Sequence, residues 1–291
     1  MNTPHPYIKT DGRVLAAIDE SAYTDSVCSH AAWAAQRLGA PLEFVHVLGR
    51  QEQPPRIDLS GNLGLGEREQ LLEELSDLDE RRGKLAQERG RLLLQHARGR
   101  ATEAGVADAD TRMRHGALVD NLVEVESDVR LFVIGKRGDH ADFAKGHLGS
   151  QLERVVRGVH RPLLVASRQF RPIRRVLVAF DGSATTRKCV EMVAASPLCK
   201  GLDIHVVMAG DRQAPGDLEW ATGVLASAGF DPTVRFVQGE PEEVISGYVA
   251  SESVDLLVMG AYGHSRIRQL IVGSTTTAML RNCRIPVLLL R

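Results

Sequence analysis

The sequence lacks any long apolar run and has almost no net charge. A membrane-spanning helix needs about 20 mostly apolar residues, and the 291-residue chain contains no such run. Its formal net charge of −1 gives no overall field that would attract nucleic acid or an anionic membrane. Residues 1–13 lack the apolar core of a signal peptide. We therefore expect a cytoplasmic protein with neither nucleic acid nor a membrane as its partner.

Cysteine is also scarce, and its spacing argues against two kinds of site. No two of the cysteines form a C-x-x-C pair, and no Cys/His set has the spacing of zinc ligands. The four cysteines are Cys28, Cys189, Cys199 and Cys283. The pattern favours reduced thiols packed as small apolar residues over redox or catalytic thiols.

The chain repeats one sequence pattern. "GRVLAAIDESAYT" at 12–24 aligns with "RRVLVAFDGSATT" at 174–186, with eight of thirteen positions identical. The offset between the copies falls from 162 residues there to 123 at Gly116 and Gly239, so the first copy carries about 39 extra residues between 49 and 104. We predict two domains, 1–168 and 169–291, with a helical insertion at about 50–104 in the first.

Each copy alternates strand-like and helix-like segments. In the second copy we predict strands at 175–180, 203–208, 232–237, 254–259 and 286–290, and helices at 184–195, 217–228, 241–252 and 274–282. The strands are continuous apolar runs, which is typical of a parallel sheet buried on both faces. The predicted fold class is therefore α/β, with two repeated doubly wound five-stranded parallel sheets of order 3-2-1-4-5 and helices on both faces.

Two unusual features of each copy are predicted to meet at one crevice. Asp19 and Asp181 end the first strand of each copy, and a glycine-rich segment follows the fourth strand. In the order 3-2-1-4-5 these strands are neighbours, and the strand order reverses between them. Ligands of such sheets bind beyond the carboxyl ends of the strands at that point.

The glycine-rich segment of the second copy, "GAYGHSRIRQLIVGST" at 260–275, has features of a phosphate-binding loop. Gly260 and Gly263 let the backbone approach a ligand closely. Gly273 and Ser274 open a predicted helix whose free N–H groups favour an anion. The spacing matches neither a Walker A loop nor the dinucleotide fingerprint. Turn glycines followed by an ordinary helix N-cap are the alternative interpretation.

Taken together, these residues resemble the universal stress protein family, whose ATP-binding members carry G-x2-G-x9-G-(S/T) after the fourth strand. Asp-x-Ser after the first strand matches in both copies, at Asp19–Ser21 and Asp181–Ser183. The resemblance implies an adenine-nucleotide alpha-hydrolase-like fold that binds ATP, with or without Mg²⁺. The nucleotide-binding residues it implies are Ala179, Asp181, Met208, Gly260, Gly263, Gly273, Ser274 and Thr275 in the second copy, and Ala17, Asp19, Val47, Gly135, Gly138, Gly149, Ser150 and Gln151 in the first.

The first copy departs from this pattern. Ten residues rather than nine separate Gly138 from Gly149, and Gln151 replaces a hydroxyl residue. Lys136, Arg137 and Lys145 add positive charge that could compensate for the change. The sequence leaves open whether one copy, both or neither binds nucleotide, and it favours the second.

The expected function is that of a stress-response protein with ATP or a related adenine nucleotide as a regulatory ligand. Neither crevice shows an evident nucleophile–base pair, and His46 and His264 are interpreted as structural or surface residues. We therefore expect at most weak ATPase activity. An ATP-hydrolysing or adenylyl-transfer enzyme on the same fold is the alternative, and an interaction module with no nucleotide is a third.

The insertion and the last strands bear on assembly. Leu71, Leu78, Leu85 and Leu92 recur every seven residues in 66–104, but Arg82, Arg89 and His96 occupy intermediate positions that a full coiled coil would make apolar. One interpretation is an elongated second helix on the sheet. The other is a protruding arm for dimer contact or for covering the first site. Separately, the Pro/Gly-rich segment 49–66 follows the predicted second strand next to the first site and is a candidate lid.

The last strand of each copy is strongly apolar, at 162–166 and 286–290. Exposed apolar sheet edges favour pairing. We predict that these edges pair within the chain as a pseudo-dimer, with a homodimer as a further option.

Overall fold

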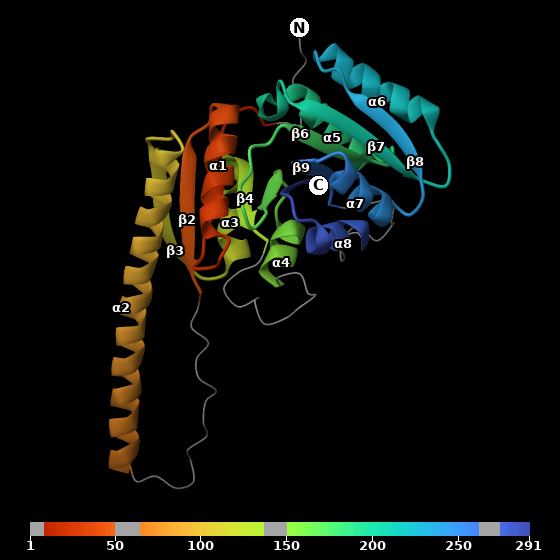
Figure 1. Ribbon diagram of the computed structural model, residues 1–291. Coiled ribbons are helices and arrows are strands. Elements are labelled where there is room, and N and C mark those ends of the chain that lie inside the picture. The colour runs from red at the N-terminus through yellow and green to blue at the C-terminus, as the bar shows by residue number, and fades with distance from the viewer. Residues whose placement is uncertain (1–8, 50–64, 137–149, 262–273) are drawn as a thin grey trace.

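The computed structural model describes residues 9–49, 65–136, 150–261 and 274–291, with the side chains of 65–72 and of Ser150 excepted. The strands of these ranges form one ten-stranded sheet, in the order β3-β2-β1-β4-β5-β10-β9-β6-β7-β8 (Figure 1). The strands are β1 (Arg13–Ala17), β2 (Leu42–Leu48), β3 (Ala109–His115), β4 (Val129–Gly135), β5 (Leu163–Ala166), β6 (Arg175–Phe180), β7 (Asp203–Gly210), β8 (Thr233–Gln238), β9 (Leu256–Gly260) and β10 (Val287–Leu290). The order 3-2-1-4-5 is confirmed in both halves.

The two halves join through their last strands. β5 and β10 pair antiparallel with Leu164 opposite Leu288, whereas the other strand pairs of the sheet are parallel. This is the pairing that the apolar strand edges predicted. Because the junction is antiparallel, the carboxyl ends of the strands in one half lie at the opposite edge of the sheet from those in the other half.

Two helices of each half cover each face of the sheet. The helices are α1 (Thr24–Leu38), α2 (Leu65–Glu103), α3 (Leu118–Val125), α4 (Ser150–Gly158), α5 (Ala184–Ala195), α6 (Pro215–Ser227), α7 (Pro241–Ser251) and α8 (Ser274–Asn282), with 3-10 turns η1 (Glu126–Asp128) and η2 (Pro197–Cys199). One buried cluster packs α1, α2, α5 and α6 on the sheet, and a second packs α3, α4, α7 and α8 on its other face. This layering is the one the alternating pattern predicted.

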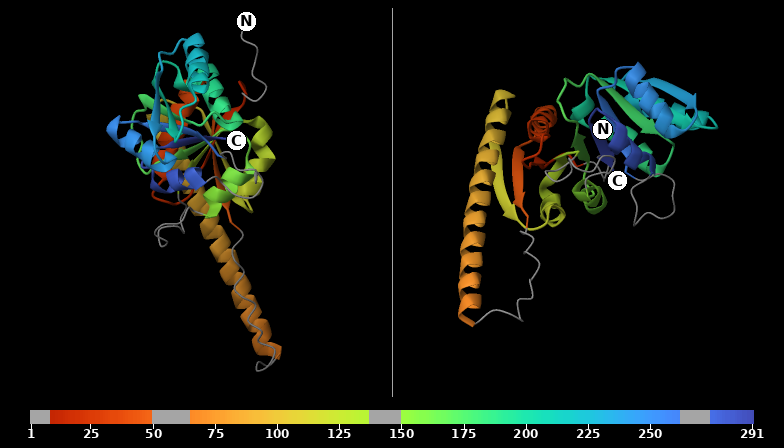
Figure 2. Two further views of the ribbon diagram at one scale, coloured as in Figure 1. Left: turned by 90° about the vertical axis from the view of Figure 1, so that its right-hand side faces the viewer. Right: turned by 60° about the horizontal axis from the view of Figure 1, so that its bottom comes forward.

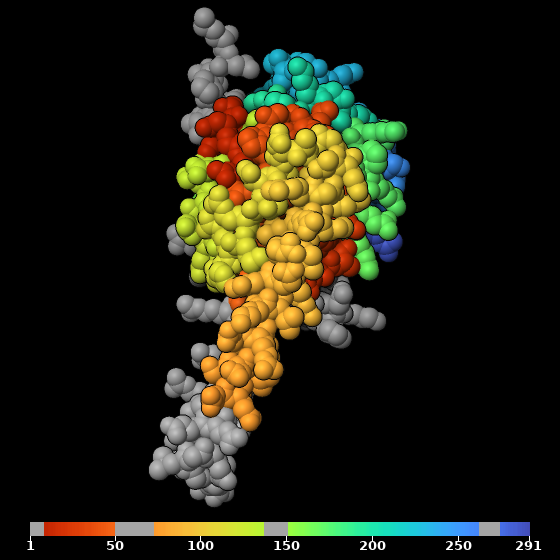
Figure 3. Space-filling model, turned by 90° about the vertical axis from the view of Figure 1, so that its left-hand side faces the viewer, coloured from red at the N-terminus to blue at the C-terminus, as the bar shows by residue number. Residues whose placement is uncertain are grey.

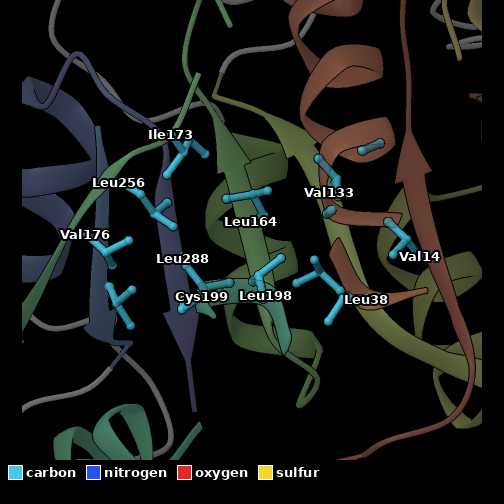
Figure 4. Close-up of a cluster of buried hydrophobic side chains, with 14 of the residues drawn as sticks. Val14, Leu38, Val133, Leu164, Ile173, Val176, Leu198, Cys199, Leu256 and Leu288 are labelled. Carbon is cyan, nitrogen blue, oxygen red and sulfur yellow. The ribbon is translucent and has the colours of Figure 1, made fainter. Parts of the chain in front are cut away.

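The core under α1 and α5 runs without interruption through both halves. Figure 4 shows Val14 and Leu164 of the first half in one row with Leu288 and Val176 of the second. At the seam Arg37 of α1 donates from Nε to the carbonyl oxygen of Leu198, 3.0 Å away in the second half. Since each fully buried aliphatic side chain contributes about 1.5–3 kcal/mol, the shared core makes the halves depend on one another for stability.

The four cysteines are buried and free, as the sequence predicted. Burial raises the pKa of Cys28 and that of Cys199 to about 12. Thiolate, the reactive form, is therefore scarce at neutral pH. These residues act as small apolar side chains.

α2 packs on the sheet with one end and projects with the other, and its role in dimer contact or in covering the first site stays a prediction. Leu94, Ala97 and Ala101 in its C-terminal part are buried against the sheet, whereas residues 73–80 are exposed throughout. The exposed part projects well beyond the body in every view (Figures 1 to 3). Within the described ranges no helix, α2 included, is both long and apolar enough to cross a membrane.

His30 of α1 predicts acid-sensitive stability. The side chain is fully buried, Nδ1 donates to the Ser26 carbonyl at 2.7 Å, and Nε2 has no partner among the described residues. Burial lowers the His30 pKa from 6.5 to about 4. The unfolded chain therefore takes up the proton first as pH falls, and stability is lost between about pH 6.5 and 4, by up to about 3 kcal/mol.

We expect His30→Leu to lose less unfolding free energy than the unsubstituted chain over that pH window. Urea denaturation of both proteins at a series of pH values measures the difference. Equal slopes against pH would show that another group carries the acid sensitivity.

Candidate functional site

The carboxyl edge of the second half gathers the predicted features around two neighbouring strands. β6 and β9 pair directly, with Val178 opposite Val258. Asp181 follows β6, Gly260 ends β9, and α8 begins at Ser274. The strand order reverses between β6 and β9, where a ligand of such a sheet binds. Asp181, Gly260 and the start of α8 thus flank one crevice.

The turn after β6 fixes the carboxylate of Asp181. Its Oδ1 accepts the backbone N–H of Ser183 at 2.9 Å and the hydroxyl of Thr186 at 2.7 Å. Ser183 is the N-cap of α5 and accepts from the Thr186 backbone N–H at 3.3 Å. Two donors on one oxygen set the orientation of the carboxylate, and an ionised carboxylate has about four acceptor positions in all. Asp181 is also exposed, so a ligand can reach its carboxylate.

Thr276 joins the start of α8 to the end of β9. Its buried hydroxyl donates to the carbonyl oxygen of Gly260 at 2.9 Å. Ser274 is exposed and Thr275 half-buried at the same helix start. The first N–H groups of a helix have no intrahelical partners, and together with the helix dipole they favour an anion. The bond of Thr276 therefore holds a potential anion site beside the end of β9.

The strand register corrects one residue of the predicted wall. Ala17 pairs with Val45 and Ala179 with Val207, so the second-half counterpart of Val47 is Ala209 and not Met208. Ala179 and Val207 belong to the cluster under α7 and α8, whereas Met208 packs on the opposite face. Successive side chains of a strand point to opposite faces. An error of one residue in aligning the two copies therefore placed the predicted wall residue on the wrong face of β7.

A cluster that the sequence did not reveal lies beside Asp181. Arg187 of α5 donates from Nη2 to the carboxylate of Asp217, and its guanidinium lies 4.4 Å from the ring centre of Trp220 on α6. Gly182 has φ +76°, and a Cβ there would come within 2.5 Å of Asp217 Oδ2. The cluster therefore fixes the start of α6 against the turn that carries Asp181.

Among the described residues, fewer hydrogen bonds hold the corresponding crevice of the first half. Asp19 Oδ1 accepts the backbone N–H of Ser21 at 3.1 Å, but the Thr24 hydroxyl donates to the Asp19 backbone oxygen rather than to its carboxylate. Leu152, buried and apolar, takes the place of Thr276. The other predicted residues lie at this edge: Ala17 and Val47 are half-buried on one face, Gly135 ends β4, Ser150 begins α4, and Gln151 is exposed.

Lys136 makes a contact between the two halves that the sequence did not predict. We expected its charge to add to the surround of the first crevice. Its ammonium group donates to the carbonyl oxygen of Cys283, just beyond α8 in the second half, and its contribution to the first crevice stays a prediction. Arg291 similarly donates from Nη1 to the carbonyl of Arg157, 2.6 Å away at the end of α4. Each half thus binds a helix end of the other.

Several predicted residues lie outside the described ranges and stay predictions. They are Gly138, Gly149, Gly263, Gly273, Arg137, Lys145, His264 and most of the proposed lid at 49–66. The part of the chain that the structure describes contains no cluster of three or more His, Cys, Asp or Glu side chains suited to a metal ion.

The described histidines near the strands have structural surroundings. Buried His46 donates from Nδ1 to the Ile18 carbonyl at 3.0 Å, in agreement with its structural interpretation. His205 lies 3.3 Å from Asp203 through Nε2 and 2.8 Å from the Tyr248 hydroxyl through Nδ1. Asp203 begins β7, so this Asp–His–Tyr chain lies at the edge of the sheet opposite Asp181.

The fold and the two switch-point crevices define a class of tandem α/β proteins with a candidate anion site in each half. The sequence profile of the universal stress protein family matches residues 12–167 and 172–291, so the chain belongs to that family as a tandem-type member.

Relatives of the same kind cover almost the whole chain. A universal stress protein of Synechocystis sp. is 39% identical over 284 residues, which are 96% of this chain and 99% of that protein. A universal stress protein of Mycobacterium tuberculosis is 24% identical over 307 residues, 96% of both chains. The crystal structure of a universal stress protein from Archaeoglobus fulgidus superposes with a TM-score of 0.68 at 18% identity, covering 96% of this chain and 98% of that one. That likeness shows the fold.

Proposed function

We propose that this protein is a cytoplasmic stress-response protein that binds ATP or a related adenine nucleotide at the second crevice as a regulatory ligand. The observation that carries the proposal is the pairing of two fixed groups at one switch point. The bond from Thr276 to Gly260 holds the start of α8, and the turn after β6 holds the Asp181 carboxylate beside it. Membership of the universal stress protein family supports the choice of nucleotide.

The described residues fit the parts of a nucleotide. The N–H groups at the start of α8 suit phosphate oxygens. The Asp181 carboxylate could accept a hydrogen bond from a ribose hydroxyl. Ala179 and Val207 offer an apolar surface on the α8 face of the sheet, next to which a base can lie. Bound ATP would supply the negative charge that the α8 start attracts.

The first crevice is proposed as the weaker site. Leu152 cannot make the bond that Thr276 makes, and the Asp19 carboxylate lacks the hydroxyl donor that orients Asp181. Both differences leave the binding groups less constrained, so more ordering entropy is lost when a ligand binds.

Little catalysis is proposed. Phosphoryl transfer requires groups that orient the attacking water and neutralise the developing charge. The groups described next to Asp181 are the hydroxyls of Ser183 and Thr186, which are already bonded to one another or to the Asp181 turn, and the Arg187 guanidinium, which is paired with Asp217. They form no nucleophile–base pair with a histidine among the described residues.

We expect one adenine nucleotide per chain when the natively purified protein, supplied with ATP, is weighed by native mass spectrometry. Two per chain would show that the first crevice also binds, and none would contradict the proposal. Release of ADP from the same preparation, followed over hours, distinguishes a regulatory protein from an enzyme. Turnover at ordinary enzyme rates, of order 1 s⁻¹ or faster, would favour an enzyme over a regulatory protein.

A further inference from the structure

The projecting part of α2 carries a leucine stripe on its outer side. Leu75, Leu78, Leu85 and Leu92 are 44%, 48%, 63% and 51% exposed. Leu78, Leu85 and Leu92 lie on the side of the helix turned away from Leu94, Ala97 and Ala101, because at about 100° per residue they fall about 100–180° from those three around the helix, and Leu75 flanks that side. Large apolar side chains exposed in a row indicate a contact surface.

The same segment divides into two blocks of opposite charge. Residues 73–80 contain five acidic side chains and no basic one, and residues 81–91 contain five basic side chains and one acidic. All of these charged residues are exposed. The helix dipole does not account for the division, because its effect fades within the first turn and the acidic block starts eight residues after Leu65.

Within one chain, the described ion pairs between the acidic and the basic block lie where the two blocks meet. Glu80 pairs with Lys84 at 2.6 Å and Asp79 with Arg82 at 4.0 Å. Farther from this boundary like charges stand four apart, as at Glu73 and Asp77, where they destabilise an isolated helix by a few tenths of a kcal/mol. A segment of opposite charge laid alongside would remove that repulsion.

We propose that the α2 segment 73–92 of this chain binds the same segment of a second copy, antiparallel to it. The register that sets the acidic block of one copy against the basic block of the other also brings Leu78 beside Leu85 of the second copy. It sets Glu74 near Arg89 and Asp77 near Lys84. A parallel pair would instead set acid against acid and base against base.

The placement of α2 fits this symmetric contact. A two-fold axis through the middle of the segment makes the two surfaces identical and closes the assembly at two copies. Because the leucine stripe faces away from the sheet, the second helix lies on the outer side of α2 (Figure 3), clear of the β2 and β3 contacts. The crevice at Asp181 lies in the other half of the chain, so this inference does not depend on the nucleotide proposal.

Sedimentation equilibrium of the full chain tests the association. We expect a dimer in the micromolar range, as for a small interface. The double substitution Leu78→Glu and Leu85→Glu is expected to raise the dissociation constant by at least about 100-fold. Val123→Glu on α3 is the matched control, because Val123 is 45% exposed and lies off the arm. A chain that is monomeric at about 100 µM, or a leucine variant that still dimerises, would overturn the proposal.

Charge exchange tests the direction of pairing. One variant carries Glu74→Lys and Asp77→Lys, and the other carries Lys84→Glu and Arg89→Glu. We expect each variant to be monomeric alone and the equimolar mixture to form a heterodimer, because the exchanged charges complement each other only between the two chains. A mixture that stays monomeric while both variants keep their helix content by circular dichroism rules out the antiparallel register.

Discussion

Asp181→Ala is expected to abolish adenine-nucleotide binding at the second crevice while the chain stays folded. The substitution removes the acceptor proposed for the ribose, and we expect the dissociation constant to rise at least about 100-fold in isothermal titration calorimetry, which corresponds to about 2.7 kcal/mol. It also removes the two bonds that Ser183 and Thr186 donate, at a cost to folding of about 1 kcal/mol each.

Asp19→Ala is the matched control for that experiment. It makes the same chemical change at the first crevice, whose contribution to binding we expect to be small. Asp181→Asn keeps the shape of the side chain without its charge and should bind with intermediate affinity. Equal affinity in Asp181→Ala and the unsubstituted chain would refute the site assignment, and a loss in Asp19→Ala alone would move the site to the first half.

Leu164→Ala is expected to destabilise both halves together. Leu164 is fully buried in β5 opposite Leu288 of β10, and truncating such a leucine costs about 2–5 kcal/mol. Because the core continues through both halves, the loss should lower the urea midpoint of the whole chain. Val123→Ala is the control, since Val123 is 45% exposed and lies outside the α2 segment proposed to bind a second copy.

The two tryptophans allow each half to be followed separately. Trp33 lies in α1 and Trp220 in α6, one in each half. With Trp33→Phe or Trp220→Phe as background, the remaining fluorophore reports its own half. We expect coincident transitions that move together on Leu164→Ala. A shift confined to the first-half reporter would show that the halves unfold independently.

The sequence predicted the strand order and most element positions because its signals were local and occurred twice. Apolar runs bounded by glycine and proline located β6 at 175–180 and α5 at 184–195, as observed. Continuous apolar strands required helices on both faces, and the apolar last strands predicted the junction. These features depend on which side chains are buried, and the pattern of apolar residues along the chain predicts burial directly.

What the sequence did not provide depended on orientation or on contacts distant in the chain. A one-residue shift was enough to exchange Met208 for Ala209, because pairing register fixes the face of each side chain. The bonds of Arg187 with Asp217 and of Lys136 with the Cys283 carbonyl join residues 30 and 147 positions apart. Thr276 is one of several consecutive hydroxyl residues in the sequence. Only the structure, in which α8 starts beside β9, shows that the Thr276 hydroxyl is the one that donates to Gly260.

The antiparallel junction of β5 and β10 reproduces within one chain the geometry of a two-fold dimer. In a dimer of identical domains every substitution occurs at both sites. In this chain each substitution occurs once, so Thr276 and Leu152 can differ at equivalent positions without disturbing the pairing of the halves. The covalent join therefore allows the residues of one crevice to change while those of the other stay the same.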